Sequence, residues 1–138
     1  MYLIDTNVIS EFRKGTRSNP GVRQFFRQVR SEGQALFLSA ITIGELRRGV
    51  ELIRRRGDEK QALLLEKWLT TVVDEYDQHI LAIDIDIAQT WGRLRVPFHE
   101  NALDKLLAAT ALVHDLALVT CNQSDFAATG VRLLNPFS

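Results

Sequence analysis

The sequence predicts an α/β domain with three layers, in which helices cover both faces of a mostly parallel sheet of four to five strands. Short apolar segments alternate with longer segments whose apolar residues recur at helical spacing, the pattern of such domains. The chain has 138 residues, 46% hydrophobic and 25% charged, as in ordinary globular proteins with one core. No linker rich in Pro, Gly or Ser divides it, so we expect residues 1–138 to form a single domain.

Five short apolar segments are the expected strands. They are Tyr2–Ile4, Ala35–Leu38, Ile80–Ile83, Leu116–Thr120 and Val131–Leu134. The first four are separated by helical segments, which favours parallel pairing. In open sheets of this kind, functional groups gather just beyond the carboxyl ends of the strands. The residues that follow each strand are therefore the first place to look for a site.

Capping residues and apolar spacing locate the helices. A short helix is expected from Asp5 through Phe12, and Pro20 suits the first position of the next one. Ser39 or Thr42 can cap a third helix, and Thr42 and Glu45 have the spacing of a capping box. This third helix is expected to continue to Arg56, and others to run from Asp58 to about Val73, from Asp84 to Arg95 and over Leu103–His114.

The formal net charge is zero, but the charges are unevenly distributed along the chain. Residues 1–60 carry 12 basic and 7 acidic side chains, whereas residues 61–138 carry 5 and 10. Such an asymmetry is a hint of a face that binds polyanions. The third helix holds the basic residues Arg47, Arg48, Arg54 and Arg55, which either form a solvated face or contact RNA phosphates.

The sequence also bears on the cellular compartment. No apolar run reaches the roughly 18 residues that a membrane helix needs. The first residues include Asp5 and no basic leader, so we expect no signal peptide. The single cysteine, Cys121, excludes an internal disulfide and suits the reducing cytosol. We therefore expect a cytoplasmic protein.

Acidic side chains follow expected strands or begin expected helices at Asp5, Glu45 and Asp104. Each has a purely local interpretation. Asp5 can cap a helix, Glu45 can be the acid of the capping box with Thr42, and Asp104 can favour the positive end of a helix dipole. The residues around Asp104 are small or apolar on nearly all sides, which predicts that it is buried.

A fourth group of polar residues, containing Asn122 and Asp125, follows the expected strand Leu116–Thr120. Turn chemistry alone favours such residues. Considered jointly, these oxygen-bearing groups lie where the fold would bring them together, and packed carboxylates repel one another unless a cation neutralises them. Oxygen ligands without a Cys/His set indicate Mg²⁺ or Mn²⁺, for which phosphodiester hydrolysis is a natural chemistry.

Four segments of the sequence, together with its last residues, occur in the order and spacing of a known protein family. These segments are Leu3–Glu11, Leu38–Gly49, Asp104–Ala111 and Val119–Phe126, followed by Leu134–Phe137. Together they resemble the PIN-domain ribonucleases, specifically the VapC toxins of VapBC-type toxin–antitoxin pairs and their FitB-like branch. The resemblance covers essentially the whole chain. It implies a PIN-like α/β/α sandwich and a metal-dependent endoribonuclease that acts as the toxin of a type II pair.

The resemblance also implies roles for residues. Asp5, Glu45 and Asp104 take the positions of the acidic triad that binds Mg²⁺ or Mn²⁺, and Asn122 or Asp125 takes the fourth position. FitB-like members have an acid where Asn122 stands, so the number of metals is open. Groups expected to support the ligands or contact phosphate are Thr6, Asn7 and Thr120. The implied partners are an RNA substrate, a second copy of the chain, and a VapB-type antitoxin through which the complex binds operator DNA.

Two other functions are compatible with the sequence. A PIN-like module that binds nucleic acid or antitoxin without cleavage is kept open by Asn122. A phosphoacceptor signalling domain would use Asp5 or Asp84, although a helix cap is the favoured interpretation of Asp84. For the antitoxin, the apolar faces of residues 41–53 and 61–73 are the expected contact surfaces.

Overall fold

Five parallel strands form the centre of the molecule in the order β3-β2-β1-β4-β5. The computed structural model describes all residues from 1 to 138. The strands are β1 (Tyr2–Ile4), β2 (Leu36–Ser39), β3 (Ile80–Leu81), β4 (Ala117–Val119) and β5 (Leu133–Leu134). The first strand is therefore central, with β2 on one side and β4 on the other. This confirms the predicted parallel sheet and, since β5 pairs with β4, the fifth strand.

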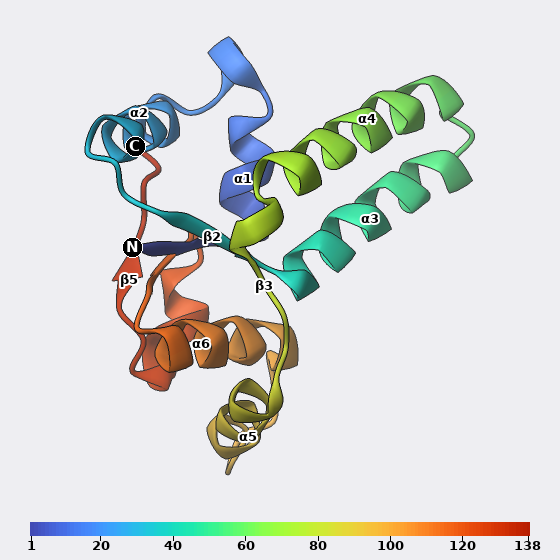
Figure 1. Ribbon diagram of the computed structural model, residues 1–138. Coiled ribbons are helices and arrows are strands. Elements are labelled where there is room, and N and C mark those ends of the chain that lie inside the picture. The colour runs from blue at the N-terminus through green and yellow to red at the C-terminus, as the bar shows by residue number, and fades with distance from the viewer.

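Six α-helices and three short 3₁₀ helices surround the sheet (Figure 1). The α-helices are α1 (Thr6–Phe12), α2 (Pro20–Ser31), α3 (Ala40–Arg55), α4 (Glu59–Glu75), α5 (Ile85–Leu94) and α6 (Ala102–His114). The 3₁₀ helices are η1 (Gly15–Arg17), η2 (Asp77–His79) and η3 (Gln123–Thr129). The predicted caps Asp58 and Asp84 accept hydrogen bonds from the third backbone amide of α4 and α5, respectively. Pro20 occupies the first position of α2.

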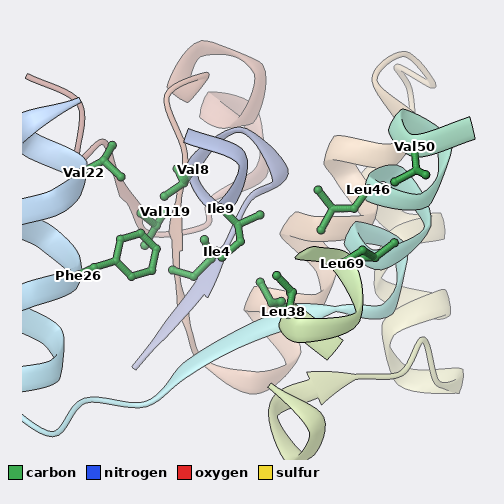
Figure 2. Close-up of a cluster of buried hydrophobic side chains, with 11 residues drawn as sticks. Ile4, Val8, Ile9, Val22, Phe26, Leu38, Leu46, Val50, Leu69 and Val119 are labelled. Atoms are coloured by element: carbon green, nitrogen blue, oxygen red, sulfur yellow. The ribbon is translucent and has the colours of Figure 1, made fainter. Parts of the chain in front are cut away.

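Successive residues of the central strands face opposite sides, and two cores result. Ile4 and Val119 belong to one core with residues of α1, α2, α3 and α4. Leu3 and Leu118 belong to the other, with residues of α6 and η3. Figure 2 shows Phe26 of α2 at one end of the first core and residues of α3 and α4 at the other. Helices on both faces explain why the strands are apolar throughout.

Helices α3 and α4 form an antiparallel pair that extends away from the sheet (Figure 1). The turn between them contains Gly57, whose φ of +90° favours glycine. Leu46 and Val50 of α3 pack with Leu69 of α4 in the first core. None of the helices is long and apolar enough to cross a membrane.

Two expectations about local structure are wrong. Ser39 caps α3, because its Oγ accepts the amide of Ile41 at 3.1 Å. Thr42 is then the third helical residue and Glu45 the sixth, so they form no capping box. Asp104 is half-buried rather than buried, because it lies in the exposed first turn of α6, whereas the buried part of this helix is Leu107–Ala111.

Candidate functional site

A cavity of about 330 Å³ lies where the carboxyl ends of β1 and β2 meet helices α1, α3 and α6. Four polypeptide segments line it. The lining residues are Asp5, Thr6 and Asn7 after β1, Ile41, Thr42 and Glu45 in α3, Leu103, Asp104 and Leu107 in α6, and Asn122 after β4. The fold therefore brings the three predicted acids to one cavity, as expected for groups beyond the carboxyl ends of parallel strands.

Asp5 is the most firmly held of the three acids. It is 6% exposed, and its Oδ1 accepts the amide of Thr6 at 2.7 Å. Its Oδ2 accepts the hydroxyl of Thr120 at 2.8 Å and the amide group of Asn7 at 3.1 Å. Asp5 thus caps α1 and also lines the cavity, so its role as a helix cap does not exclude a role in the site.

Asn7 and Thr120 join α1 to the chain after β4. The Asn7 Oδ1 accepts the backbone amide of Cys121 at 3.2 Å. The Thr120 hydroxyl accepts the backbone amide of Asn122 at 3.0 Å while it donates to Asp5. These bonds fix Asn122 beside the cavity. The structure therefore places Thr6, Asn7 and Thr120 in contact with Asp5. These are the residues that we expect to support the ligands or to contact phosphate.

Glu45 reaches the cavity from the second turn of α3. It is half-buried and takes part in none of the ion pairs within the chain. Since it lies beyond the first turn, a role in capping does not explain its position. Its carboxylate is available to the cavity.

The pKa values show that the acids interact. The pKa of Asp104 is raised to about 6, first by burial and then by the nearby carboxylates of Asp5, Asp125 and Glu45, in that order. Burial also raises the pKa of Asp5 above its usual range, against the hydrogen bonds of Thr120, Thr6 and Asn7, which lower it. The cavity therefore holds negative charge that the protein does not neutralise.

Asn122 and Asp125, the two candidates for the fourth ligand position, differ in their distance from the cavity: only Asn122 lines it. Asn122 lines the cavity and is exposed. Asp125, in η3, is not among the lining residues, but its charge contributes to the raised pKa values of Asp5 and Asp104. Asn122 thus offers a neutral oxygen at the cavity, and Asp125 acts on it through its electric field.

The side chains that line the cavity offer mainly oxygen ligands. No three His, Cys, Asp or Glu side chains converge closely enough to hold an ion by themselves. Mg²⁺ usually keeps several waters and binds one or two carboxylates, so a pair such as Asp5 and Asp104 satisfies its needs. All polar side chains of the cavity present oxygen or amide groups, with no thiol or imidazole among them. The residues fit a hydrated Mg²⁺ or Mn²⁺ and not zinc.

The basic residues of α3 divide into two pairs. Arg47 and Arg54 are held by acids: Arg47 lies 2.6 Å from Glu66 of α4, and Arg54 lies 2.6 Å from Glu51. Arg54 also contacts Glu66 at 3.3 Å. These two guanidinium groups link α3 to α4, which speaks against their expected contact with RNA. Arg48 and Arg55 are exposed and form no ion pair, as RNA contact would require.

Sequence reasoning missed part of the cavity wall. The capping pattern explains Thr42 only as a cap, but this residue lies one turn before Glu45 and therefore on the same helix face. Leu103 and Leu107 lie beside Asp104 at similar spacing and form the apolar part of the wall. These residues could be predicted from the sequence, because they stand at helical spacing from the predicted acids Glu45 and Asp104.

Comparisons with known proteins identify a family that this chain matches over most of its length. The family model described as "PIN domain" matches residues 2–131. A curated relative named "Toxin FitB", from Neisseria gonorrhoeae, is 32% identical over 99% of each chain. The "VapC ribonuclease Y4jK" of Sinorhizobium fredii is 28% identical over 99% of this chain and 98% of its own.

Solved structures are also similar. The crystal structure of FitAcB from Neisseria gonorrhoeae matches with a TM-score of 0.85 at 32% identity, over 99% of this chain and 98% of that one. A toxin–antitoxin complex from Klebsiella pneumoniae matches with a TM-score of 0.65 at 26% identity, over 100% of this chain and 99% of the other. The similarity extends over the whole length of the chain in both comparisons.

Proposed function

Since the chain belongs to the PIN domain family, we propose that it is a metal-dependent endoribonuclease and the toxin of a type II toxin–antitoxin pair. The observation that carries the proposal is the cavity lined jointly by Asp5, Glu45 and Asp104. Full-length relatives named as a toxin and as a ribonuclease support it.

Within this proposal, Asp5 and Asp104 would hold the principal Mg²⁺ or Mn²⁺. Asp5 is fixed by its hydrogen bonds to Thr6, Asn7 and Thr120, so its orientation is set before a metal arrives. Asn122 supplies a neutral oxygen at the same place. When bound there, such a cation would neutralise the carboxylates and would stabilise negative charge on a phosphate, a contribution of several kcal/mol to catalysis in order of magnitude.

Glu45 acts on the attacking water in this scheme. Water forms a bond from its oxygen to phosphorus and gives a proton to the Glu45 carboxylate. One ester bond between phosphorus and a ribose oxygen breaks, and its electron pair stays on that oxygen, which takes up a proton from solvent water. The products are a phosphomonoester end and a hydroxyl end. Exposed Arg48 and Arg55 are the basic residues of α3 that remain for contacts with RNA phosphates.

The proposed partner is a VapB-type antitoxin. A groove of about 340 Å³ lies between α1, α3 and α4, and Thr6 and Glu45 line both this groove and the acidic cavity. Apolar residues that include Ile53 and Leu65 form much of its wall, within the surfaces expected for the antitoxin. A segment seated there would place a basic side chain among the carboxylates. A homodimer, and binding of the complex to operator DNA through the antitoxin, complete the proposed assembly.

A paired substitution tests the proposal. Asp5→Asn removes a charge from the cavity and should abolish growth arrest and cleavage of total RNA in Mg²⁺ or Mn²⁺. Asp84→Asn is the matched control, because Asp84 is exposed and caps α5, outside the cavity. The control should keep full activity. Activity that survives Asp5→Asn contradicts the assignment of the site.

The same experiment separates the other functions. An unmodified chain that cleaves no RNA with either metal, but binds RNA or antitoxin, is a binding module. Loss of function in Asp84→Asn with activity kept in Asp5→Asn would favour a phosphoacceptor at Asp84. The position of Asp84 speaks against that role, since its Oδ1 accepts the amide of Ile87 at 2.9 Å as a simple helix cap.

A further inference from the structure

Asp5 and Asp104, the two proposed metal ligands, are held in different ways. Asp5 accepts hydrogen bonds from Thr6, Asn7 and Thr120, which fix its carboxylate directly. No hydrogen bond contributes to the raised pKa of Asp104, which comes from burial and neighbouring carboxylates, and Asp104 forms no ion pair. The place of the Asp104 carboxylate is therefore set by the backbone of the first turn of α6.

The first turn of α6 has little support of its own. Asn101, the residue before the helix, has a left-handed backbone with a φ of +55° and provides no side-chain cap. Leu103 is 48% exposed, and the buried part of the helix begins only at Leu107. The Nζ of Lys105 donates to the carbonyl of Phe98, but Phe98 lies in the exposed loop between α5 and α6, so this bond ties the turn only to the loop before it.

One side chain of a neighbouring helix holds this turn. Helix α5 packs against α6 (Figure 1), and the indole Nε1 of Trp91 donates to the carbonyl of Ala102, the first residue of α6, at 2.8 Å. The guanidinium carbon of Arg95 lies over the Trp91 ring, 4.5 Å from its centre. Leu94 of the same helix packs against the second core. The contacts therefore run from this core through α5 to a carbonyl two residues before Asp104.

We propose that Trp91 is a positioning residue that holds the first turn of α6 so that the Asp104 carboxylate stays beside Asp5 in the acidic cavity. The inference rests on the proposed function, in which these two acids would hold the metal. Trp91 does not line the cavity, so it touches no metal bound there. It acts through the backbone, in the way that groups outside the ligand shell orient a metal ligand.

A matched pair of substitutions at the two ends of α6 tests the proposal. Trp91→Phe keeps an aromatic ring beside Arg95 and removes the N–H that reaches Ala102. Arg132→Met is the control, because Arg132 donates to the carbonyl of Asp115, the residue after α6, at 2.9 Å. Each variant removes a side-chain hydrogen bond to a carbonyl at one end of the same helix. An effect on the stability of α6 alone would be shared by both variants, whereas an effect on the site would be confined to Trp91→Phe.

Metal binding is the first readout, at a temperature where both variants are folded. We expect the Kd for Mn²⁺, measured by calorimetry, to rise about tenfold in Trp91→Phe and to stay unchanged in Arg132→Met. Cleavage of a random-sequence hexaribonucleotide pool with a fluorophore and a quencher is the second. There Trp91→Phe should need about tenfold more Mn²⁺, and its kcat at saturating Mn²⁺ should be within about threefold of that of the unmodified chain.

Hydrogen exchange in the metal-free protein gives a readout that does not depend on activity. The Lys105 amide donates to the Asn101 carbonyl at 2.9 Å at the start of α6, and the Leu116 amide donates to the Ala111 carbonyl at 2.8 Å beyond its end. Exchange of the Lys105 amide should become about tenfold faster in Trp91→Phe, and that of the Leu116 amide should not change. The control variant should leave the Lys105 amide unchanged.

The possible failures are distinguishable. An unchanged Mn²⁺ affinity in Trp91→Phe overturns the role of Trp91 and leaves the proposed function intact. Equal losses of Mn²⁺ affinity in Trp91→Phe and Arg132→Met also overturn it, since the indole hydrogen bond would then only stabilise the helix. An unmodified chain that neither binds Mn²⁺ nor cleaves RNA overturns the proposed function itself, and this inference with it.

Discussion

Asp104→Asn should make the metal-free protein more stable at neutral pH while it removes a metal ligand. The folded protein keeps the Asp104 proton up to a pH near 6, whereas the unfolded chain loses it near the ordinary value of 3.8. Proton uptake therefore accompanies folding between these values. The stability that the protonated carboxyl contributes is fully present below pH 3.8 and is lost as the pH rises through 6.

The magnitude follows from the same values. Each pKa unit corresponds to about 1.4 kcal/mol, so the difference sets an upper limit of about 3 kcal/mol on the electrostatic destabilisation at neutral pH. Asp104 is only half-buried, and solvent screens its interactions with neighbouring carboxylates, so we expect about 1 kcal/mol. Asparagine resembles the protonated carboxyl in shape and carries no charge. The variant should therefore gain this amount at pH 7.5 and nothing below pH 3.8.

Urea unfolding with a chelator present, at an acidic and a neutral pH, measures the difference. Asp84→Asn serves as the control, because it removes a carboxylate outside the cavity. Added Mg²⁺ should then stabilise the unmodified chain and leave Asp104→Asn unchanged. An Asp104→Asn protein that is no more stable than the unmodified chain at pH 7.5 would refute the reasoning.

Two further predictions concern stability. Asn7→Ala removes the side chain that joins α1 to the chain after β4 and should lower the free energy of unfolding by about 1–2 kcal/mol in urea titrations; an unchanged midpoint would mean that these hydrogen bonds contribute nothing net. Gly44→Ala should raise the free energy of unfolding by about 1 kcal/mol, because Gly44 lies inside α3 and an added Cβ would meet no atom within 4 Å. A lower melting temperature of this variant would contradict the helix-propensity argument.

Local signals predicted the helix ends and most of the strands. Caps such as Asp58 and Asp84 act on amides three residues away, so the sequence contains all the information that places them. The third strand was expected to reach Ile83, but β3 ends at Leu81. This strand lies at the edge of the sheet and pairs only with β2, so its length depends on a partner that the sequence does not place beside it.

The acids of the site were predictable, and their surroundings were not. Asp5 follows β1, Asp104 lies in the first turn of α6 and Glu45 lies in the second turn of α3, so each position can be found from the local sequence. The expected capping box at Thr42 is wrong for a different reason. Both Ser39 and Thr42 match the pattern of a helix cap, and only the hydrogen bond from the Ile41 amide to the Ser39 Oγ shows which of them caps α3. The ion pair between Arg47 and Glu66 joins two helices across 19 residues of sequence, so no local pattern announces it.

The pairing of β1 with β4 has a consequence for the timing of activity during synthesis. Asp5 receives its hydrogen bond from Thr120, which lies 115 residues later in the chain. A nascent chain therefore carries Asp5 and Glu45 long before it can complete the cavity, which needs α6 and the residues after β4. For a chain that we propose to cut RNA, this topology postpones any cleavage until α6 and the residues after β4 have been synthesised.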